Sequence, residues 1–175
     1  IAEFSIDFRQ AGMIPVCQVV METLQEKRAR HLLALRARGL TDSSLLSAIE
    51  QIPRENFVPS RWQTDVYAGR SLPLPCGQDM TPAVQVAQTA DALRLDASCR
   101  VLELGTGSGY QTALLAQLAR QVVTIERFAT LLDGAKEQLD YLGLSQSVVF
   151  LLADGVDGHA PHAPYDRIIS NFSFK

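Results

Sequence analysis

The sequence has little that would place the chain in a membrane or in a disulfide framework. Its 175 residues contain no apolar run near the roughly 18 residues that cross a bilayer. The three cysteines, Cys17, Cys76 and Cys99, are odd in number and far apart, and they form no C-x-x-C pair. This spacing argues against a zinc motif and against a set of disulfides. We therefore expect reduced cysteines, no metal site, no membrane partner and a cytoplasmic location.

The chain also lacks an excess of positive charge. A formal net charge of −3 gives no electrostatic attraction to nucleic acid, so we expect no nucleic-acid partner. A hydrophobic share of 47% and this length suit a single globular domain with a real core. Residues 1–21 show no readable pattern and lack the basic flank of a signal peptide, so they are expected to form a tail.

The most informative stretch runs from Val101 to Tyr110. Apolar residues lead into Glu103, and glycines then follow at positions 105, 107 and 109. A helical pattern begins at once, which predicts a buried strand, a tight glycine turn and a helix. Glycine lets a ligand approach bare backbone, and the helix start presents free N–H groups. The order E-x-G-x-G-x-G differs from the G-x-G-x-x-G of dinucleotide folds. It resembles motif I of the class I S-adenosylmethionine (SAM) methyltransferases.

A second acidic residue strengthens this interpretation. The next predicted strand, residues 121–126, ends at Glu126, about 20 residues beyond the glycine turn, where a ribose-binding acid is expected. A carboxylate there can accept hydrogen bonds from both ribose hydroxyls. NAD binding is an alternative interpretation of the same geometry.

Apolar periodicity predicts the other elements. Helices are expected over 22–38, from a cap at Thr41 or Asp42 to Pro53, from a cap at Thr81 to Leu93, and over 128–142. Further strands are expected over 147–152 and 166–170.

Two N-terminal blocks narrow the resemblance to one family. Residues 36–42 read R-A-R-G-L-T-D, and residues 52–59 read I-P-R-E-N-F-V-P. They resemble the R-A-R-G-I-x-D and V-P-R-x-x-F-V-P blocks of the protein-L-isoaspartate O-methyltransferases. The match continues at Tyr67, Leu72-Pro73-Leu74-Pro75, Gly77-Gln78, Thr124-Ile125-Glu126-Arg127, Asp154-Gly155 and residues 163–169, so it covers roughly residues 22–170.

This resemblance implies an α/β fold with a Rossmann-like parallel sheet, whose four strands would lie in the order 3-2-1-4. Residues 22–98 would form an N-terminal helical region on the substrate side, and residues 99–175 the SAM-binding core, with the family's C-terminal part absent. The implied activity is methyl transfer from SAM to the free carboxylate of L-isoaspartyl residues in peptides and proteins. The implied cofactor contacts are Gln78, Met80, Thr81, Glu103, Gly105, Thr106, Gly107, Gly109, Glu126, Arg127, Ala153, Asp154 and Gly155.

One block departs from the family pattern. The family carries G-Q-T-I-S-x-P, and its serine hydroxyl lies at the active site. Here Thr81 takes the place of that serine, and Asp79 takes the place of the threonine. Thr81 is therefore the expected active-site hydroxyl, whereas the Asp79 charge would oppose an anionic substrate. This departure favours a class I methyltransferase for another small acceptor as an alternative.

The absent C-terminal part leads to two further expectations. It favours a third interpretation, an incomplete homologue with weak or no turnover. It would also leave the fourth strand as an apolar edge carrying Ile168, Ile169, Phe172 and Phe174. We expect the complete protein to be a monomer and this shorter chain to self-associate through that edge.

Overall fold

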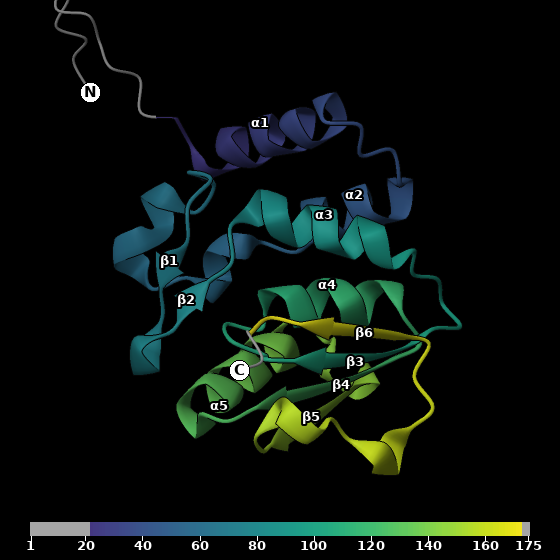
Figure 1. Ribbon diagram of the computed structural model, residues 1–175. Helices are drawn as coiled ribbons and strands as arrows, with labels where there is room; N and C mark the ends of the chain where they lie inside the picture. The colour runs from purple at the N-terminus through teal and green to yellow at the C-terminus, as the bar shows by residue number, and fades with distance from the viewer. Residues whose placement is uncertain (1–21, 173–175) are drawn as a thin grey trace, which may run out of the picture.

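The computed structural model describes residues 22–172 (Figure 1). The expected tail over residues 1–21 and the edge residue Phe174 lie outside the described residues. Within this range no helix is long and apolar enough to cross a bilayer.

The centre of the fold is a four-stranded parallel sheet. Its strands are β3 (Arg100–Leu104), β4 (Gln121–Glu126), β5 (Val148–Leu152) and β6 (Arg167–Ser170). They lie in the order β5-β4-β3-β6, which confirms the expected 3-2-1-4 order. Parallel pairing requires a crossover connection between consecutive strands, and the helices after β3 and β4 provide it. Consecutive residues of β3 and β4, beginning with Val101 and Val122, are buried because both faces of these central strands are covered.

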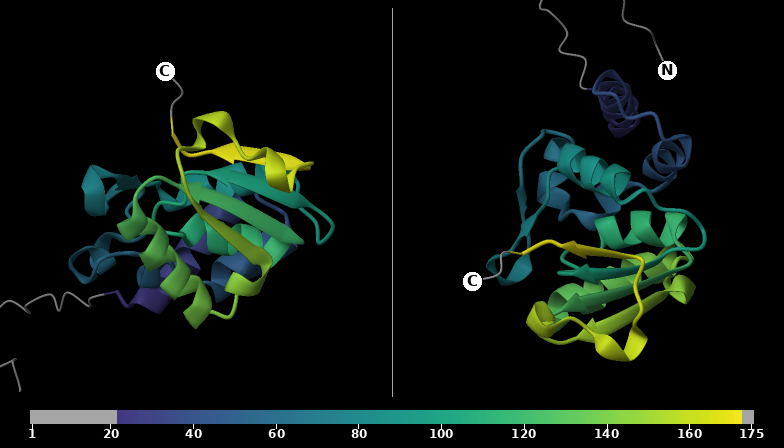
Figure 2. Two further views of the ribbon diagram at one scale, coloured as in Figure 1. Left: turned by 90° about the horizontal axis from the view of Figure 1, so that it is seen from below. Right: turned by 45° about the vertical axis from the view of Figure 1, so that its right-hand side comes forward.

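The five expected helices are all present. They are α1 (Leu24–Ala37), α2 (Ser43–Gln51), α3 (Ala83–Leu93), α4 (Tyr110–Leu118) and α5 (Ala129–Tyr141). The α4 helix lies over the sheet, α2 and α3 lie over α4, and α1 is outermost (Figures 1 and 2). One buried cluster joins these layers, with Leu35, Leu45, Ile49, Leu114 and Leu139 almost completely buried. The N-terminal helices are thus anchored to the same helical layer that covers the sheet.

Local signals explain where these helices begin. The Thr23 side chain and Glu26 form a reciprocal capping box at α1. The Asp42 carboxylate accepts from the backbone N–H groups of the first turn of α2, so Asp42, not Thr41, is the cap. The cap expected from Thr81 is wrong. Pro82 occupies the N-cap position of α3 and makes no side-chain cap bond, so Thr81 lies one residue too early to reach the first turn.

The segment between α2 and α3 is irregular, and apolar periodicity in the sequence predicts no helix or strand within it. It contains the 3-10 helices η2 (Arg54–Phe57), η3 (Ser60–Asp65) and η4 (Pro75–Gly77), and the short antiparallel pair β1 (Leu72–Pro73) and β2 (Asp79–Met80). Three more 3-10 helices, η5 (Ser145–Ser147), η6 (Gly155–Asp157) and η7 (Ala160–His162), flank β5. The β1–β2 pair brings residues 78–81 to the carboxyl edge of the sheet, where the strands end.

The β6 strand is one of the two outer strands of the described sheet. Its Ile168 side chain is 60% exposed, whereas Ile169 is buried against α4. Apolar surface exposed on an outer strand can pair with another chain, and self-association through β6 stays a prediction.

Candidate functional site

A cavity of about 500 Å³ opens at the carboxyl ends of the four parallel strands. This is the edge at which open α/β sheets bind ligands. Its wall includes eleven of the thirteen predicted cofactor contacts: Gln78, Met80, Thr81, Gly105, Thr106, Gly107, Glu126, Arg127, Ala153, Asp154 and Gly155. The two predicted residues that do not line the cavity are Glu103 and Gly109.

Strand order fixes the sequence of polar groups along the cavity. Asp154 follows β5, Glu126 ends β4, Gly105 follows β3 and Asn171 follows β6. Because the strands lie in the order β5-β4-β3-β6, Asp154 and Asn171 stand at opposite ends of the row. Glu126 and the glycine turn lie between them.

Two glycines of the turn are required for different physical reasons. Gly105, Gly107 and Gly109 all have positive φ, of 92°, 56° and 84°. A Cβ at Gly107 would meet only a Leu74 methyl group, at 3.9 Å, so this backbone is open towards the cavity. A Cβ at Gly109 would lie 2.7 Å from the Ala135 Cβ. Gly109 therefore serves the close packing of α4 on α5 and not contact with a ligand.

The Glu126 carboxylate is held rigidly at the cavity wall. One oxygen accepts from the Gly107 N–H at 3.0 Å. The other accepts from the N–H groups of Arg127 and Phe128, at 2.9 and 3.1 Å. Each carboxylate oxygen has two lone-pair directions, so acceptor capacity is left for a ligand hydroxyl. The side chain thus ties the glycine turn to the end of β4 and presents an acceptor to the cavity.

Glu103 faces the opposite way, into the interior. Its carboxylate is completely buried and accepts from the hydroxyls of Thr112 and Thr124, at 2.5 and 2.8 Å. The Gln111 amide donates to its other oxygen at 3.1 Å. Burial raises the pKa of Glu103 to about 7, although these hydrogen bonds oppose that change. Glu103 was expected to contact a cofactor directly. In the structure it lies behind the glycine turn and supports the turn from the interior.

Gln111 carries this support to the cavity. Its amide also donates to the Asn171 side chain at 3.1 Å, and the Asn171 amide donates to the Gly105 carbonyl at 2.9 Å. Gln111 and Asn171 both line the cavity. A buried polar network whose members are hydrogen-bonded stiffens its surroundings, so Glu103 fixes the position of residues that do face a ligand.

Arg54 is the most unusual residue at this site, because its charged side chain is completely buried. Its Nη2 donates to the Thr81 carbonyl at 2.6 Å and its Nε to the Val66 carbonyl at 3.1 Å. The guanidinium lies over the Tyr110 ring, 4.8 Å from its centroid, while Nη1 has no hydrogen-bond partner among the described residues. Burial lowers the pKa of Arg54 to about 10, so it is still charged at neutral pH. It places a positive charge behind Thr81.

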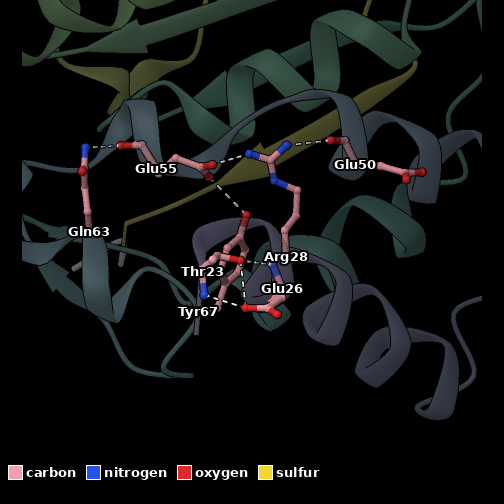
Figure 3. A network of polar contacts seen from close by, with 7 residues as sticks. All are labelled: Thr23, Glu26, Arg28, Glu50, Glu55, Gln63 and Tyr67. Atoms are coloured by element: carbon pink, nitrogen blue, oxygen red, sulfur yellow. Dashed lines mark hydrogen bonds and ion pairs between the residues drawn. The ribbon is translucent and has the colours of Figure 1, made fainter. Parts of the chain in front are cut away.

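The neighbouring residue anchors η2, the 3-10 helix that carries Arg54. The Glu55 carboxylate pairs with Arg28 of α1 and accepts from the Tyr67 hydroxyl (Figure 3). Arg28 also donates to the Glu50 carbonyl at the end of α2, at 3.2 Å. Arg54 and Glu55 therefore point to opposite sides, with Glu55 holding the N-terminal helices and Arg54 reaching the cavity.

Two carboxylates complete the cavity wall. Asp154 is exposed, and its Oδ1 accepts from the Val156 N–H at 3.2 Å, so the turn after β5 orients it. Asp79 on β2 is also exposed and lines the cavity. Within the described residues no cluster of three potentially metal-ligating side chains occurs.

Sequence reasoning missed several residues of the wall, among them Arg54, Gln111 and Asn171. Arg54 stood within the matched I-P-R-E-N-F-V-P block without an assigned role. Asn171 comes directly after β6, much as Asp154 comes shortly after β5 at the opposite edge of the sheet. Applying that rule to the fourth strand would have found Asn171.

A parallel sheet with a glycine turn after β3, an acidic residue at the end of β4 and another just past β5 defines the Rossmann-like fold of class I methyltransferases. A solved protein-L-isoaspartate O-methyltransferase superposes with a TM-score of 0.70 at 26% identity, covering 82% of this chain and 47% of that one. A putative protein-L-isoaspartate O-methyltransferase from Plasmodium falciparum, solved with S-adenosyl-L-homocysteine, gives a TM-score of 0.69 at 17% identity, which shows the fold alone.

The chain belongs to the protein-L-isoaspartate(D-aspartate) O-methyltransferase family, whose model matches residues 26–173. A protein-L-isoaspartate O-methyltransferase from Maricaulis maris is 44% identical over 138 residues, 79% of this chain and 64% of that protein. A relative from Caulobacter sp. is 43% identical over 136 residues, 78% of this chain and 62% of that protein. The chain thus spans just under two thirds of these relatives. Membership favours the methyltransferase interpretation over NAD binding.

Proposed function

We propose that this chain binds SAM in the cavity at the carboxyl edge of its sheet. The proposed reaction is transfer of the SAM methyl group to the free α-carboxylate of L-isoaspartyl residues in damaged peptides and proteins. The observation that carries the proposal is the row Asp154, Glu126, Gly107 and Thr81 along one cavity in a chain of this family. By the family's chemistry, a backbone amide nitrogen of the peptide then displaces methanol from the methyl ester, and the resulting succinimide begins repair to aspartate.

The residues present fit this cofactor. The cavity of about 500 Å³ is within the usual range for small-molecule sites, roughly 300–1,000 Å³. Asp154 would accept from the adenine amine and Glu126 from the ribose hydroxyls, while the open backbone at Gly107 admits the amino-acid part. SAM supplies an electrophilic methyl group on its sulfonium.

The acceptor needs little chemical activation from the protein. An α-carboxylate is already ionised at neutral pH, so no general base is required. The protein must instead hold the carboxylate oxygen in line with the methyl–sulfur bond and exclude water. Thr81 borders the cavity with a hydroxyl that can donate to this carboxylate. The charge of Arg54, which binds the Thr81 carbonyl, favours an anion nearby.

The proposal is tested by labelled methyl transfer. The chain is incubated with methyl-labelled SAM and a synthetic peptide containing one L-isoaspartyl residue, beside the same peptide with L-aspartate. We expect base-labile label on the isoaspartyl peptide alone. Equal labelling of both peptides, or labelling of neither while S-adenosylhomocysteine binds, would contradict the proposed acceptor.

Asp79 favours one second candidate. Its exposed carboxylate lines the cavity, where it raises the cost of bringing in an anion. A cationic or neutral small acceptor would not be repelled by the Asp79 carboxylate. Methylation of a small-molecule panel without methylation of the isoaspartyl peptide would support this candidate.

The cellular compartment and the partners of the chain are also part of the proposal. Cys76 and Cys99 are free thiols in the structure, which suits a reducing compartment such as the cytoplasm. The proposed partners are isoaspartyl peptides and proteins.

A further inference from the structure

The buried Arg54 side chain has no counter-ion among the residues that the structure describes. Four ion pairs occur in this part of the chain, and none of them includes Arg54. The next residue, Glu55, carries the nearest carboxylate in the sequence, and this carboxylate pairs with Arg28. A charge that has lost its water is costly to bury unless an opposite charge accompanies it. Arg54 therefore lacks the partner that a buried cation normally has.

The titratable side chains that interact electrostatically with Arg54 are His31, Tyr67 and Tyr110. Burial, together with the nearby Arg54 charge, lowers the pKa of His31 to about 4. Burial raises the pKa of Tyr67 to about 12 and also raises the pKa of Tyr110. All three are thus neutral at pH 7. Two carbonyls and an aromatic ring stabilise the guanidinium, but they do not neutralise it, and Nη1 has no hydrogen-bond partner within the described residues.

Arg54 borders the cavity in which we expect the cofactor. Thr81 and Tyr110, the residues that its guanidinium contacts at 2.6 Å and 4.8 Å, line the same cavity. Opposite charges attract more strongly in a site of low dielectric constant than in water. An anionic group that enters beside Thr81 therefore supplies the missing counter-ion, whereas a neutral group does not.

The other charged groups of the described cavity wall do not provide an anion site. Three of them are the carboxylates of Asp79, Glu126 and Asp154. The second cation, Arg127, is exposed and directly follows Glu126. Water and salt screen an exposed charge, so Arg127 attracts an anion less strongly than a buried cation does. Arg54 is therefore the group that can make the cavity favourable for an anion.

The order of groups along the cavity brings two carboxylates towards Arg54. Asp154 and Glu126 would hold the adenine and ribose of SAM, so the amino-acid part, with its carboxylate, lies towards Thr81. The carboxylate of the acceptor must approach the same end, because the reacting methyl group lies there. Either carboxylate can act as the counter-ion.

We propose that Arg54 makes the cavity selective for ligands that carry a carboxylate, by acting as the cation for which the fold itself provides no counter-ion. This inference rests on the proposed function for the identity of the two ligands. It assigns a binding role to a residue that also holds the Thr81 carbonyl in place.

The test uses two pairs of ligands, each differing only in one carboxylate. The first pair is S-adenosylhomocysteine and its decarboxylated form, which keeps the ammonium group. The second pair is an isoaspartyl peptide and the same peptide with the α-carboxylate replaced by a carboxamide, added to the chain saturated with S-adenosylhomocysteine. Calorimetry gives the ratio of the two Kd values in each pair, so a general loss of affinity in a variant cancels.

The parent should bind the ligand with the carboxylate about tenfold more tightly in at least one pair, as expected for a hydrogen bond to a charged group. Arg54→Met should remove most of this preference. Arg54→Lys keeps the charge but not the planar fork, so it should keep part of the preference. Arg61→Met is the matched control and should behave as the parent does, because Arg61 is exposed on η3 and does not line the cavity.

A measurement on the parent alone separates the two cations of the cavity wall. A preference produced by the buried Arg54 should change little between low and high salt. A preference produced by the exposed Arg127 should shrink several-fold as salt is added, and this result would contradict the role of Arg54. This comparison holds even if Arg54→Met does not fold.

The outcomes also separate this inference from the proposed function. Loss of the preference in the first pair assigns Arg54 to the carboxylate of SAM, and loss in the second pair assigns it to the acceptor. The role of Arg54 is refuted if the parent shows no preference in either pair, or if Arg54→Met keeps the preference of the parent in both. If the preference depends on Arg54 but labelled methyl transfer fails, the role of Arg54 stands and the proposed reaction is wrong.

Discussion

Replacing the buried Glu103 by glutamine should change how the stability of the protein depends on pH. The Glu103 carboxylate is completely buried, and its pKa is raised from 4.5 to about 7 by burial. A folded protein that keeps this proton up to about pH 7 binds it more tightly than the unfolded chain does. This tighter proton binding stabilises the folded state. Its contribution to the free energy of unfolding is complete below pH 4.5 and is lost as pH rises through 7. In Glu103→Gln this contribution to the pH dependence is absent.

The magnitude follows from the two pKa values. Between pH 5 and pH 8 the parent should lose about 2–3 kcal/mol of unfolding free energy through Glu103, at roughly 1.4 kcal/mol per pKa unit. At pH 5 the two proteins should be similar, since a protonated carboxyl and an amide both serve Thr112, Thr124 and Gln111. Relative to the parent, Glu103→Gln should therefore gain stability as pH rises.

The assay is urea unfolding at pH 5, 6, 7 and 8 for the parent and Glu103→Gln, with equal m-values as the criterion for comparison. Glu137→Gln is the matched control, because it removes an exposed carboxylate from α5. Parallel curves for the parent and Glu103→Gln across this range would refute the buried, proton-holding role of Glu103.

Three further predictions concern single residues. Glu126→Ala should weaken binding of S-adenosylhomocysteine about tenfold to a hundredfold, as loss of a charged acceptor implies, and an unchanged Kd in calorimetry would remove Glu126 from the site. Asp79→Thr should lower the KM for the isoaspartyl peptide, most clearly at low salt, and no improvement there would mean that Asp79 does not repel the substrate. Gly109→Ala should cost about 1–3 kcal/mol in urea unfolding because its Cβ would lie 2.7 Å from that of Ala135. Adding Ala135→Gly should restore part of this loss, and equal losses in the single and double variants would contradict the contact.

Much of the fold follows from local patterns in the sequence. The strand over 121–126 has the predicted bounds, and the helix expected over 128–142 extends from Ala129 to Tyr141. These elements are long and periodic, so burial of one face determines them. The glycine turn could be predicted because glycines at alternate positions directly follow a buried strand. The structure gives these glycines positive φ, which glycine adopts readily.

The parts that were missed depend on contacts distant in the sequence. The two-residue strands β1 and β2 are too short to show a period, and they form only where the chain returns on itself. The sequence favours Thr81 as a cap because proline suits the first helical position, whereas in the structure Pro82 is itself the N-cap residue. Nothing local to Glu103 distinguishes a carboxylate that faces a ligand from one that faces Thr112 and Thr124.

The most direct test of the account is a crystal structure of the chain with S-adenosylhomocysteine. We expect the ribose hydroxyls within hydrogen-bond distance of Glu126, the adenine beside Asp154, and the sulfur at the end of the cavity near Thr81. A ligand in the reverse direction, with its adenine near Asn171, would contradict the order of groups on which the donor site rests, as would a ligand bound outside this cavity.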